Sequence, residues 1–494
     1  MDSEYDVIVA GASNAGGFAA AAAAEKGAKV LLIDKQKDAS HLYRFWIGGV
    51  NSKAQTKAGI HIDKDQLRQF LIAFTQGNCD QTLINTWIDN SGESADWLED
   101  KILKPHGDHL YAVKDAHYET LQNMAFPTEQ HPSKDDKSDD WNYGQYILDF
   151  VKDHGGDIKY STKLEHLITN EYGNVIGAEL KDMTTGITSK VKAKKGVILA
   201  TGGYGNNKAL LQNWNPTILE KCCWTQSPRD DGSGQEAALE IGAARDEEGA
   251  SIIFDRGQVP VDTNINEMYE ARWDVPQFVL GSYPLLKVNK EGKRFFNEST
   301  PYQFAMNSLM HQPDHLEAMI WNEDTMNHLA QFHTLGCSRL GWPGIFDTEG
   351  EKKSLADSLK NNIAQKADSL EELAKKMHLP KYNLVATVKK YNEYCKQGVD
   401  KEFGKEKSRL YPVDGGPYYG IWLSGNLLAT LDGLHINDHM QVLRRNNKPI
   451  KGLYAAGNCS GGFFWGSYED RVPGLTCSHA QTFGRLAGQY VLSD

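Results

Sequence analysis

The sequence lacks several features that would place it in other classes of protein. No run approaches the roughly 18 apolar residues that a membrane-spanning helix needs. The first predicted strand begins by residue 6, which leaves no room for a signal peptide. The net charge of −12 argues against nucleic-acid and anionic-membrane partners. These absences predict a soluble, cytoplasmic protein with no membrane span and no nucleic-acid partner.

Metal, haem and disulfide signals are also lacking. The 16 histidines show no ligand spacing, so we expect no metal site. The 7 cysteines show no repeated spacing, which indicates reduced thiols rather than a disulfide framework. Cys222 and Cys223 are adjacent and are not followed by histidine, so they form neither a haem attachment site nor a C-x-x-C redox pair.

The chain begins with a strand, a tight turn, an alanine-rich helix and a second strand. Apolar residues lead into Gly11, a helix is predicted from Phe18 to Lys26, and a strand over residues 29–33 ends at Asp34. This order is typical of a dinucleotide-binding unit, in which backbone N–H groups at the helix start face a pyrophosphate. Asp34 is placed to accept a ribose hydroxyl. Ser13 replaces the middle glycine of G-x-G-x-x-G, and a ligand-free structural βαβ unit is the alternative.

Two later strands also end in small residues. Residues 196–205 end in Ala-Thr-Gly-Gly-Tyr-Gly, and residues 450–462 contain Tyr-Ala-Ala-Gly-Asn. Paired glycines at Gly48 and Gly49 suggest another close backbone approach. One long ligand that touches all three strand ends explains them together.

The length of 494 residues predicts two domains or one domain with a large insertion. Residues 251–430 are rich in aromatics and helical patterns and have no further glycine-ended strand, so we expect them to form a second domain inserted into the first. Residues 128–141 are polar, and we expect a solvated surface loop there.

Six motifs across nearly the whole chain resemble the FAD-dependent fumarate reductase and 3-ketosteroid dehydrogenase superfamily. They are residues 6–17, the A-T-G-G-Y-G end, D-G-S-G at 231–234, K-V-N-K-E-G-K-R-F-F-N-E-S at 287–299, G-L-Y-A-A-G-N-C-S-G-G at 452–462 and T-F-G-R-L-A-G at 482–488. The resemblance implies an α/β fold. A Rossmann-like FAD-binding domain would span 1–250 and 431–494, and an inserted α+β capping domain would span 251–430.

The resemblance also implies the cofactor and its contacts. His41 lies one residue out of register with the histidine to which some members attach FAD, so we expect non-covalent FAD. The residues expected to hold it are Gly11, Ser13, Ala15, Gly16, Asp34, Lys35, Gly48, Gly49, Ala200, Thr201, Gly202, Asp231, Gly232, Gly457, Asn458, Gly474 and Leu475.

The proton relay of the fumarate reductases is missing. Tyr302 occupies the position of their proton-donating arginine, and Phe278 and Gly281 occupy their upstream relay positions. Ala429 replaces their substrate-binding histidine. Ketosteroid dehydrogenases and enone reductases resemble this chain more closely here, because N-E-S-x-P-Y places a tyrosine beside the flavin. Packing in the cap is the other interpretation of Tyr302.

Arg471 aligns with the substrate arginine of the fumarate reductases, and Gly474 with a following glycine. Arg471 would grip a carboxylate or carbonyl oxygen through charge-assisted hydrogen bonds. A salt bridge to Glu469 or Asp470 is its alternative role. Asp470 stands where the steroid enzymes have a tyrosine, and Tyr468 lies two residues earlier, so the match to a steroid dehydrogenase is incomplete.

The resemblance therefore implies an FAD-dependent reductase of a C=C bond conjugated to a carbonyl or carboxylate. Hydride would come from flavin N5, the proton from Tyr302, and Arg471 with the Gly474 N–H would hold the oxygen. The expected substrates are an enone, an enoic acid or a steroid-like ketone, with an external electron donor or acceptor. A 3-ketosteroid dehydrogenase working in the oxidative direction and a catalytically decayed flavin-binding protein are the alternatives.

Overall fold

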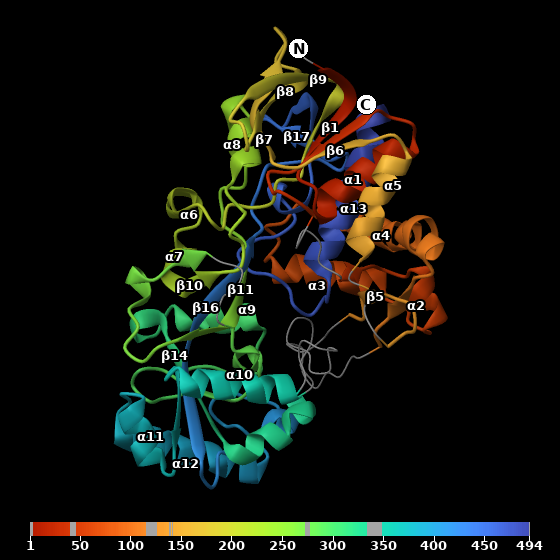
Figure 1. Ribbon diagram of the computed structural model, residues 1–494. Coiled ribbons are helices and arrows are strands. Elements are labelled where there is room, and N and C mark those ends of the chain that lie inside the picture. The colour runs from red at the N-terminus through yellow and green to blue at the C-terminus, as the bar shows by residue number, and fades with distance from the viewer. Residues whose placement is uncertain are drawn as a thin grey trace.

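The computed structural model describes residues 3–39, 46–114, 126–137, 140, 142–271, 277–332 and 348–493. Its largest sheet has the strand order β17-β18-β9-β1-β2-β6, with β8 paired to β9 and β7 to β8 (Figure 1). The strands of this sheet are β1 (Ser3–Ala10), β2 (Val30–Ile33), β6 (Asp157–Lys159), β7 (Thr162–Thr169), β8 (Val175–Asp182), β9 (Thr188–Leu199), β17 (Gln441–Leu443) and β18 (Pro449–Ala455).

Parallel pairing in this sheet gathers the predicted strand ends at one edge. β1 pairs in parallel with β2 and β9, and β18 pairs in parallel with β9. Val7, Ile8 and Val9 are fully buried, as expected of a parallel strand covered on both faces. The carboxyl ends of β1, β9 and β18 therefore lie side by side, although these strands are far apart in the chain.

The first and last helices of the chain pack together against this sheet. A Cβ atom on Gly484 would lie 2.1 Å from the Ala15 carbonyl oxygen, and one on Gly488 would lie 2.2 Å from the Ala19 oxygen. Small residues on both helices are therefore what allow this close contact. The helices are α1 (Asn14–Glu25), α2 (Lys53–Lys57), α3 (Lys64–Phe74), α4 (Gln81–Leu98), α5 (Tyr143–Asp153), α6 (Lys208–Trp214), α7 (Thr217–Lys221), α8 (Ser233–Glu240), α9 (Tyr302–Leu309), α10 (Thr348–Lys360), α11 (Leu370–Lys376), α12 (Lys381–Gln397) and α13 (Leu475–Ser493).

A second sheet is built around the long strand β16, which runs down through the lower half of Figure 1 toward α11 and α12. β16 pairs in parallel with β10 and antiparallel with β11, β14 and β15. The strands are β10 (Cys222–Thr225), β11 (Ser251–Val259), β12 (Glu270–Ala271), β13 (Leu286–Val288), β14 (Glu317–Asn322), β15 (Ala364–Ala367) and β16 (Tyr418–Thr430). Most of this sheet comes from the residues predicted to form the inserted unit.

The prediction of a solvated loop over residues 128–141 is wrong for its first part. Glu129–Ser133 form a fully buried strand, β5, which pairs with β3 (Ile47–Gly48) and β4 (His109–Ala112). The polar side chains find partners inside: Glu129 Oε1 lies 2.7 Å from His131 Nε2, and Gln130 Oε1 accepts a hydrogen bond of 2.6 Å from Ser52. Only Lys134–Lys137 are exposed as expected, and residues 138, 139 and 141 lie outside the described residues.

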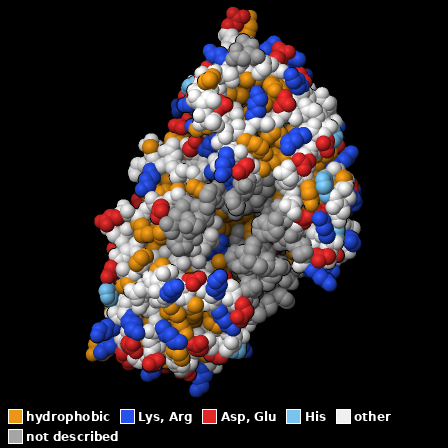
Figure 2. Space-filling view, in the orientation of Figure 1, with side chains coloured by type: hydrophobic (Ala, Val, Ile, Leu, Met, Phe, Trp, Pro, Cys, Tyr) orange, Lys and Arg blue, Asp and Glu red, His pale blue; other side chains and the backbone are white. Residues whose placement is uncertain are grey.

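Acidic and basic side chains are interspersed over the face of the molecule shown in Figure 2. None of the helices in the described part of the chain is both long enough and apolar enough to cross a bilayer.

Candidate active site

The carboxyl edge of the first sheet opens into a cleft of about 220 Å³. Ten of the predicted cofactor residues line it, and they come from all three strand ends. These ten are Gly11, Ser13, Ala15, Asp34, Lys35, Ala200, Thr201, Gly202, Gly457 and Asn458. The structure thus brings together segments that are separated by hundreds of residues in the sequence.

The amino end of α1 faces this cleft and suits an anion. Ser13 is the N-cap residue, but its side chain makes no capping hydrogen bond, and the first turn of α1 contains no acidic residue. The backbone N–H groups of that turn and the helix dipole therefore remain available to a pyrophosphate. Gly11 makes the preceding turn with φ +101°, and a Cβ there would lie 2.1 Å from the Ala200 oxygen. The site fits the diphosphate of FAD.

Charged residues surround the far end of the cleft. The Asp34 carboxylate accepts backbone N–H bonds of 2.9 Å from Ala12 and 2.8 Å from Gln36, and it lines the cleft. Lys35 Nζ lies 2.8 Å from Asp231 Oδ2. Burial alone would raise the pKa of Asp231, but the ammonium of Lys35 and a hydrogen bond with Ser233 bring it down to about 2. Asp231 thus stays ionised and positions Lys35.

The other predicted cofactor residues lie outside the lining of this cleft. A Cβ on Gly48 would lie 2.9 Å from the Gly474 oxygen, so these two backbones touch each other. Gly16 packs against the Gly11 carbonyl in the same way, since a Cβ atom on Gly16 would lie 1.6 Å from the Gly11 oxygen. The full set outside the lining is Gly16, Gly48, Gly49, Asp231, Gly232, Gly474 and Leu475.

Several lining residues were not predicted. Asp230 lies at the cleft, and burial raises the pKa of its carboxyl to about 6. Thr476, Cys477 and Ala480 come from one face of α13, and their small-residue spacing in the sequence could have indicated this contact. Lys163 comes from β7, where the sequence gives no signal.

Tyr302 and Arg471 lie together, held by Asp470. Tyr302 is the first residue of α9, and its backbone N–H donates to the Asp470 carboxylate. Arg471 Nη1 lies 3.5 Å from Asp470 Oδ1, and its Nη2 donates to the Ser299 carbonyl at 3.3 Å. Both predicted site residues are more than nine-tenths buried. The ion pair that the sequence offered as an alternative role for Arg471 does form.

Burial raises the pKa of both carboxyls beside Arg471. The pKa of Glu469 lies well above its ordinary value because of burial and because of the neighbouring Asp470. Burial also raises the pKa of Asp470, against the opposing effect of Arg471. The backbone N–H of Arg471 donates to Glu469 Oε1 at 2.5 Å. One guanidinium thus lies among two buried carboxyls, which favours retention of a proton there.

Tyr302 also packs against an aromatic neighbour. Its ring meets that of Phe254 edge-on, with 5.0 Å between the centroids. Phe278, at a relay position of the fumarate reductases, is fully buried, and its ring centroid lies 5.7 Å from that of Trp321. Gly281, at the other relay position, packs against the backbone of Asp255 and Arg256. These two positions hold no titratable side chain. His41 lies outside the described residues.

Within the described residues, no group of three or more histidine, cysteine, aspartate or glutamate side chains could hold a metal ion.

Comparison with known proteins gives a consistent result. The family model described as FAD binding domain matches residues 6–471. A vinyl phenol reductase of Lactiplantibacillus plantarum is 28% identical and aligns over 98% of this chain and 96% of its own length. A probable fumarate reductase of Shewanella frigidimarina is 27% identical over 98% of this chain and 74% of its own.

A solved structure shares the fold. The 3-ketosteroid-Δ4-(5α)-dehydrogenase of Rhodococcus jostii RHA1, in complex with 4-androstene-3,17-dione, has a TM-score of 0.74 and 23% identity, with 99% of this chain and 97% of that chain covered. The predicted α/β class, the superfamily and the FAD cofactor are thus confirmed. The chain belongs to the FAD binding domain family and is an FAD-dependent oxidoreductase acting on C=C or CH–CH groups.

Proposed function

We propose that the protein reduces a C=C bond conjugated to a carbonyl or carboxylate. The observation that supports this most is the Asp470 carboxylate, which holds a tyrosine and an arginine next to each other. A permanent cation and a titratable hydroxyl are the two groups that such a reduction needs from the protein. The two sequence relatives named above are reductases, which supports the reductive direction.

Each side chain has one task in this proposal. FAD, when bound, supplies the hydride that adds to the β-carbon. The Arg471 guanidinium and the Gly474 N–H hold the substrate oxygen, where negative charge develops as the bond is reduced. Arginine is suited to this task because it stays protonated. The Tyr302 hydroxyl gives its proton to the α-carbon.

The proposed division of the chain follows the two sheets. Residues 1–250 and 431–494 form the FAD-binding domain, and residues 251–430 form the substrate-capping domain. Pairing of β11 with β16 joins the beginning and the end of the capping segment and supports this division. β10, at Cys222–Thr225, pairs with β16 and so joins the same sheet from outside the segment.

We propose that FAD is held without a covalent bond and that the protein acts in the cytoplasm. Every cysteine that the structure describes is a free thiol, which is consistent with a reducing compartment. Release of flavin on denaturation, measured by filtration, supports the non-covalent mode. Flavin retained on the denatured chain contradicts it.

The test of the function is anaerobic reoxidation of the dithionite-reduced enzyme by a panel of alkenes. The panel contains enones, enoic acids, a vinyl phenol and a ketosteroid. We expect rapid reoxidation by an enone or enoic acid. Preference for the vinyl phenol would mean that the group conjugated to the C=C bond of the substrate is a phenol ring and not a carbonyl or carboxylate. No reoxidation by any member of the panel would favour a catalytically decayed flavin-binding protein.

Oxidation of a ketosteroid is tested separately with the oxidised enzyme and an artificial electron acceptor. A turnover rate above that of alkene reduction would overturn the reductive direction. The proposal predicts little activity in this direction, because Asp470 occupies the place of the tyrosine found in the steroid enzymes.

A further inference from the structure

Two residues just before β5 hold the backbone of the segment that carries Arg471 and Gly474. The Phe126 N–H donates to the Arg471 carbonyl at 2.9 Å, and the Thr128 hydroxyl donates to the Pro473 carbonyl at 2.7 Å. The same hydroxyl lies 3.4 Å from the Phe126 oxygen, which is too long for a strong O–H···O hydrogen bond. The single proton of the Thr128 hydroxyl therefore goes to the Pro473 carbonyl.

This hydrogen bond also acts on the Gly474 N–H. The Pro473 carbonyl and the Gly474 N–H belong to one peptide group, which is planar and trans, so the N–H points away from the side on which the carbonyl is held. A hydrogen bond accepted by the carbonyl also polarises the peptide group and makes its N–H a stronger donor. Thr128 thus fixes the direction of the Gly474 N–H and strengthens it.

The Gly474 N–H is left for a ligand. Gly474 is buried, and its N–H donates to no atom of the described residues. A buried N–H without a partner is rare and costly in a folded protein. Gly474 also directly precedes α13, whose dipole favours a negative charge at this end. An oxygen that gains negative charge during a reaction is therefore a partner that suits this N–H.

Thr128 is itself held in place beside the small sheet of β3, β4 and β5. It is fully buried, and its carbonyl accepts a hydrogen bond of 3.0 Å from the Gly49 N–H. The adjoining Pro127 carbonyl accepts a hydrogen bond of 2.8 Å from the Gln55 side chain. The Ser478 hydroxyl of α13 donates to the Gly48 carbonyl of β3 at 2.9 Å. The small sheet and the beginning of α13 are therefore joined around the Gly474 peptide.

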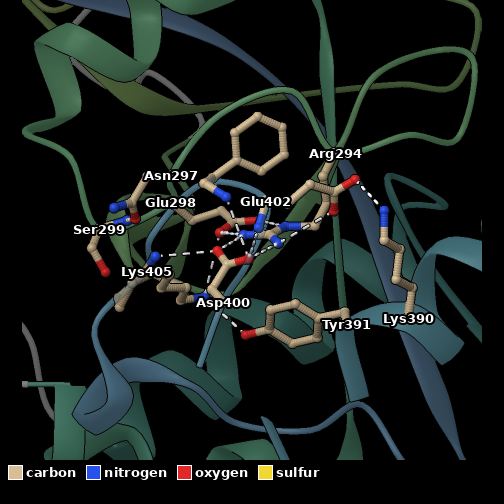
Figure 3. A network of polar contacts seen from close by, with 11 residues as sticks. Arg294, Asn297, Glu298, Ser299, Lys390, Tyr391, Asp400, Glu402 and Lys405 are labelled. Atoms are coloured by element: carbon tan, nitrogen blue, oxygen red, sulfur yellow. Dashed lines mark hydrogen bonds and ion pairs between the residues drawn. The ribbon is translucent and has the colours of Figure 1, made fainter. Parts of the chain in front are cut away.

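The guanidinium of Arg471 is held separately, by the segment between β13 and α9. Its Nη2 atom donates to the Ser299 carbonyl at 3.3 Å. Figure 3 shows Ser299 beside Glu298, whose two carboxylate oxygens accept hydrogen bonds of 2.8 and 2.7 Å from Arg294. The two oxygen-binding groups thus have separate supports, and the Thr128 hydroxyl acts on only one of them.

We propose that Thr128 is a positioning residue for alkene reduction and directs the Gly474 N–H at the substrate oxygen through the shared peptide group. The proposal rests on the proposed function, in which the Arg471 guanidinium and the Gly474 N–H hold that oxygen. Negative charge builds on the oxygen as the bond is reduced, so the direction of the N–H matters more in the transition state than in the bound substrate. Thr128 does not touch the oxygen in this role and acts through Gly474.

The test compares wild type with Thr128→Val, which keeps the shape of the side chain and removes the donor. The reduced enzyme is mixed with increasing concentrations of the active alkene by stopped flow, which separates the limiting rate of reoxidation from the substrate dissociation constant. Loss of a complete oxyanion donor slows a reaction by about 10²–10³-fold, so we expect a donor that has lost only its orientation to slow it by about 10-fold. The dissociation constant should stay near that of wild type, because the Arg471 contact is kept. An unchanged limiting rate, or a change confined to the dissociation constant, would overturn the proposal.

Two further variants separate this role from an effect on general stability. Thr128→Ser keeps the hydroxyl and should restore the wild-type limiting rate. Thr387→Val is the matched control, because the Thr387 hydroxyl on α12 donates to the Gly292 carbonyl at the same distance of 2.7 Å. It should leave the limiting rate unchanged. A slow Thr128→Ser enzyme, or an equal loss of rate in Thr387→Val, would contradict a role for the Thr128 hydroxyl.

A second measurement needs no turnover. The oxidised enzyme is titrated with para-substituted phenols, whose phenolate oxygen stands for the charge that develops on the substrate, and binding is followed by charge-transfer absorbance with the flavin. Thr128→Val should lower phenolate affinity by a factor similar to its loss in limiting rate, and Thr128→Ser should not. Three results would overturn the proposal: equal affinities, no phenolate binding by wild type, or loss of flavin from purified Thr128→Val, which would assign the N–H to FAD. If wild type reduces no alkene in the panel, the proposed function fails, and the phenol titration alone decides the role of Thr128.

Discussion

Tyr302 and Arg471 are joined by a single carboxylate, that of Asp470, which accepts the backbone N–H of the tyrosine and ion-pairs with the arginine. The backbone at the residue that carries the proposed acid and the proposed oxygen-binding side chain are thus held by the same carboxylate before a substrate arrives. Preorganisation of this kind is how a protein stabilises charge that develops during a reaction.

Tyr302→Phe should keep FAD and substrate binding and slow the first turnover by about 10²–10⁴-fold, the usual contribution of a positioned acid. Stopped-flow reoxidation of the reduced enzyme measures it. Tyr5→Phe is the control, because the Tyr5 hydroxyl donates to Asp157 Oδ2 at 2.7 Å and has no part in the proposed reaction. An undiminished rate in Tyr302→Phe would assign the proton to another group, with Tyr269, Tyr283 and Tyr468 to be tested next.

Arg471→Ala should weaken substrate binding and slow the reaction together, since the oxygen is held in both the ground state and the transition state. The loss in kcat/KM should be at least that of one charged hydrogen bond, about 1.5–3 kcal/mol. Arg471→Lys keeps the positive charge between Asp470 and Glu469 but loses the planar, two-pronged set of N–H donors of the guanidinium. Its loss in kcat/KM should therefore be intermediate. Steady-state kinetics at several substrate concentrations separate KM from kcat. A change confined to KM would show that Arg471 does not stabilise the transition state more than the bound substrate.

Gly11→Ala should abolish FAD retention. The new methyl group would lie 2.1 Å from the Ala200 oxygen at a position with φ +101°, so the turn below α1 has to move. Gly27→Ala is the matched control. Gly27 has a φ of +82°, but a Cβ added there meets no described atom within 4 Å, which leaves only backbone strain of about 1–2 kcal/mol. The ratio of flavin to protein absorbance after purification measures the effect. Full flavin content in Gly11→Ala would show that the pyrophosphate of FAD does not bind at the turn before α1.

His479→Leu should make the protein less sensitive to acid. His479 is 1% exposed among the rings of Phe463, Phe464 and Phe483, and burial lowers its pKa to about 3. The unfolded chain binds the proton at about pH 6.5 and the folded protein does not, so stability falls as pH decreases below 6.5. The slope is up to about 1.4 kcal/mol per pH unit.

Denaturant unfolding of wild type and His479→Leu, from neutral pH down to about pH 4, checks this prediction. The difference in unfolding free energy should move in favour of the variant as pH falls. His61→Leu, at an exposed position, should show no such trend. A pH-independent difference for His479→Leu would contradict the prediction.

The convergence of three strand ends at one cleft was predictable because its signals are local. The turn at Gly11, Asp34 at the end of β2, and the small residues after β9 and β18 each follow directly from one stretch of sequence. Parallel pairing then brings the three ends to one edge. Gly48 and Gly474 stay predicted cofactor residues. Their backbones contact each other, and sequence alone cannot distinguish a glycine required for contact with a ligand from one required for contact with another backbone.

The buried polar parts were not predictable. Residues Glu129–Ser133 have the composition of a surface loop, and their burial follows from pairing with β3 and β4 and from contacts with each other and with Ser52. Lys287 appeared in the sequence only as part of a family motif. Its two carboxyl partners, Asp255 and Glu317, lie on β11 and β14, and no sequence spacing connects three strands that meet only in the folded sheet.

The close contact between α1 and α13 has a consequence for biosynthesis. During translation, the βαβ unit emerges long before the helix that covers Ala15 and Ala19 and before Thr476 and Cys477, which complete the cleft wall. One face of α1 therefore stays uncovered in the nascent unit, because a large part of the chain must be synthesised before α13 can pack against it. The cleft is consequently completed only after α13 has been synthesised, and a chain that ends before that helix lacks Thr476, Cys477 and Ala480 from the cleft wall.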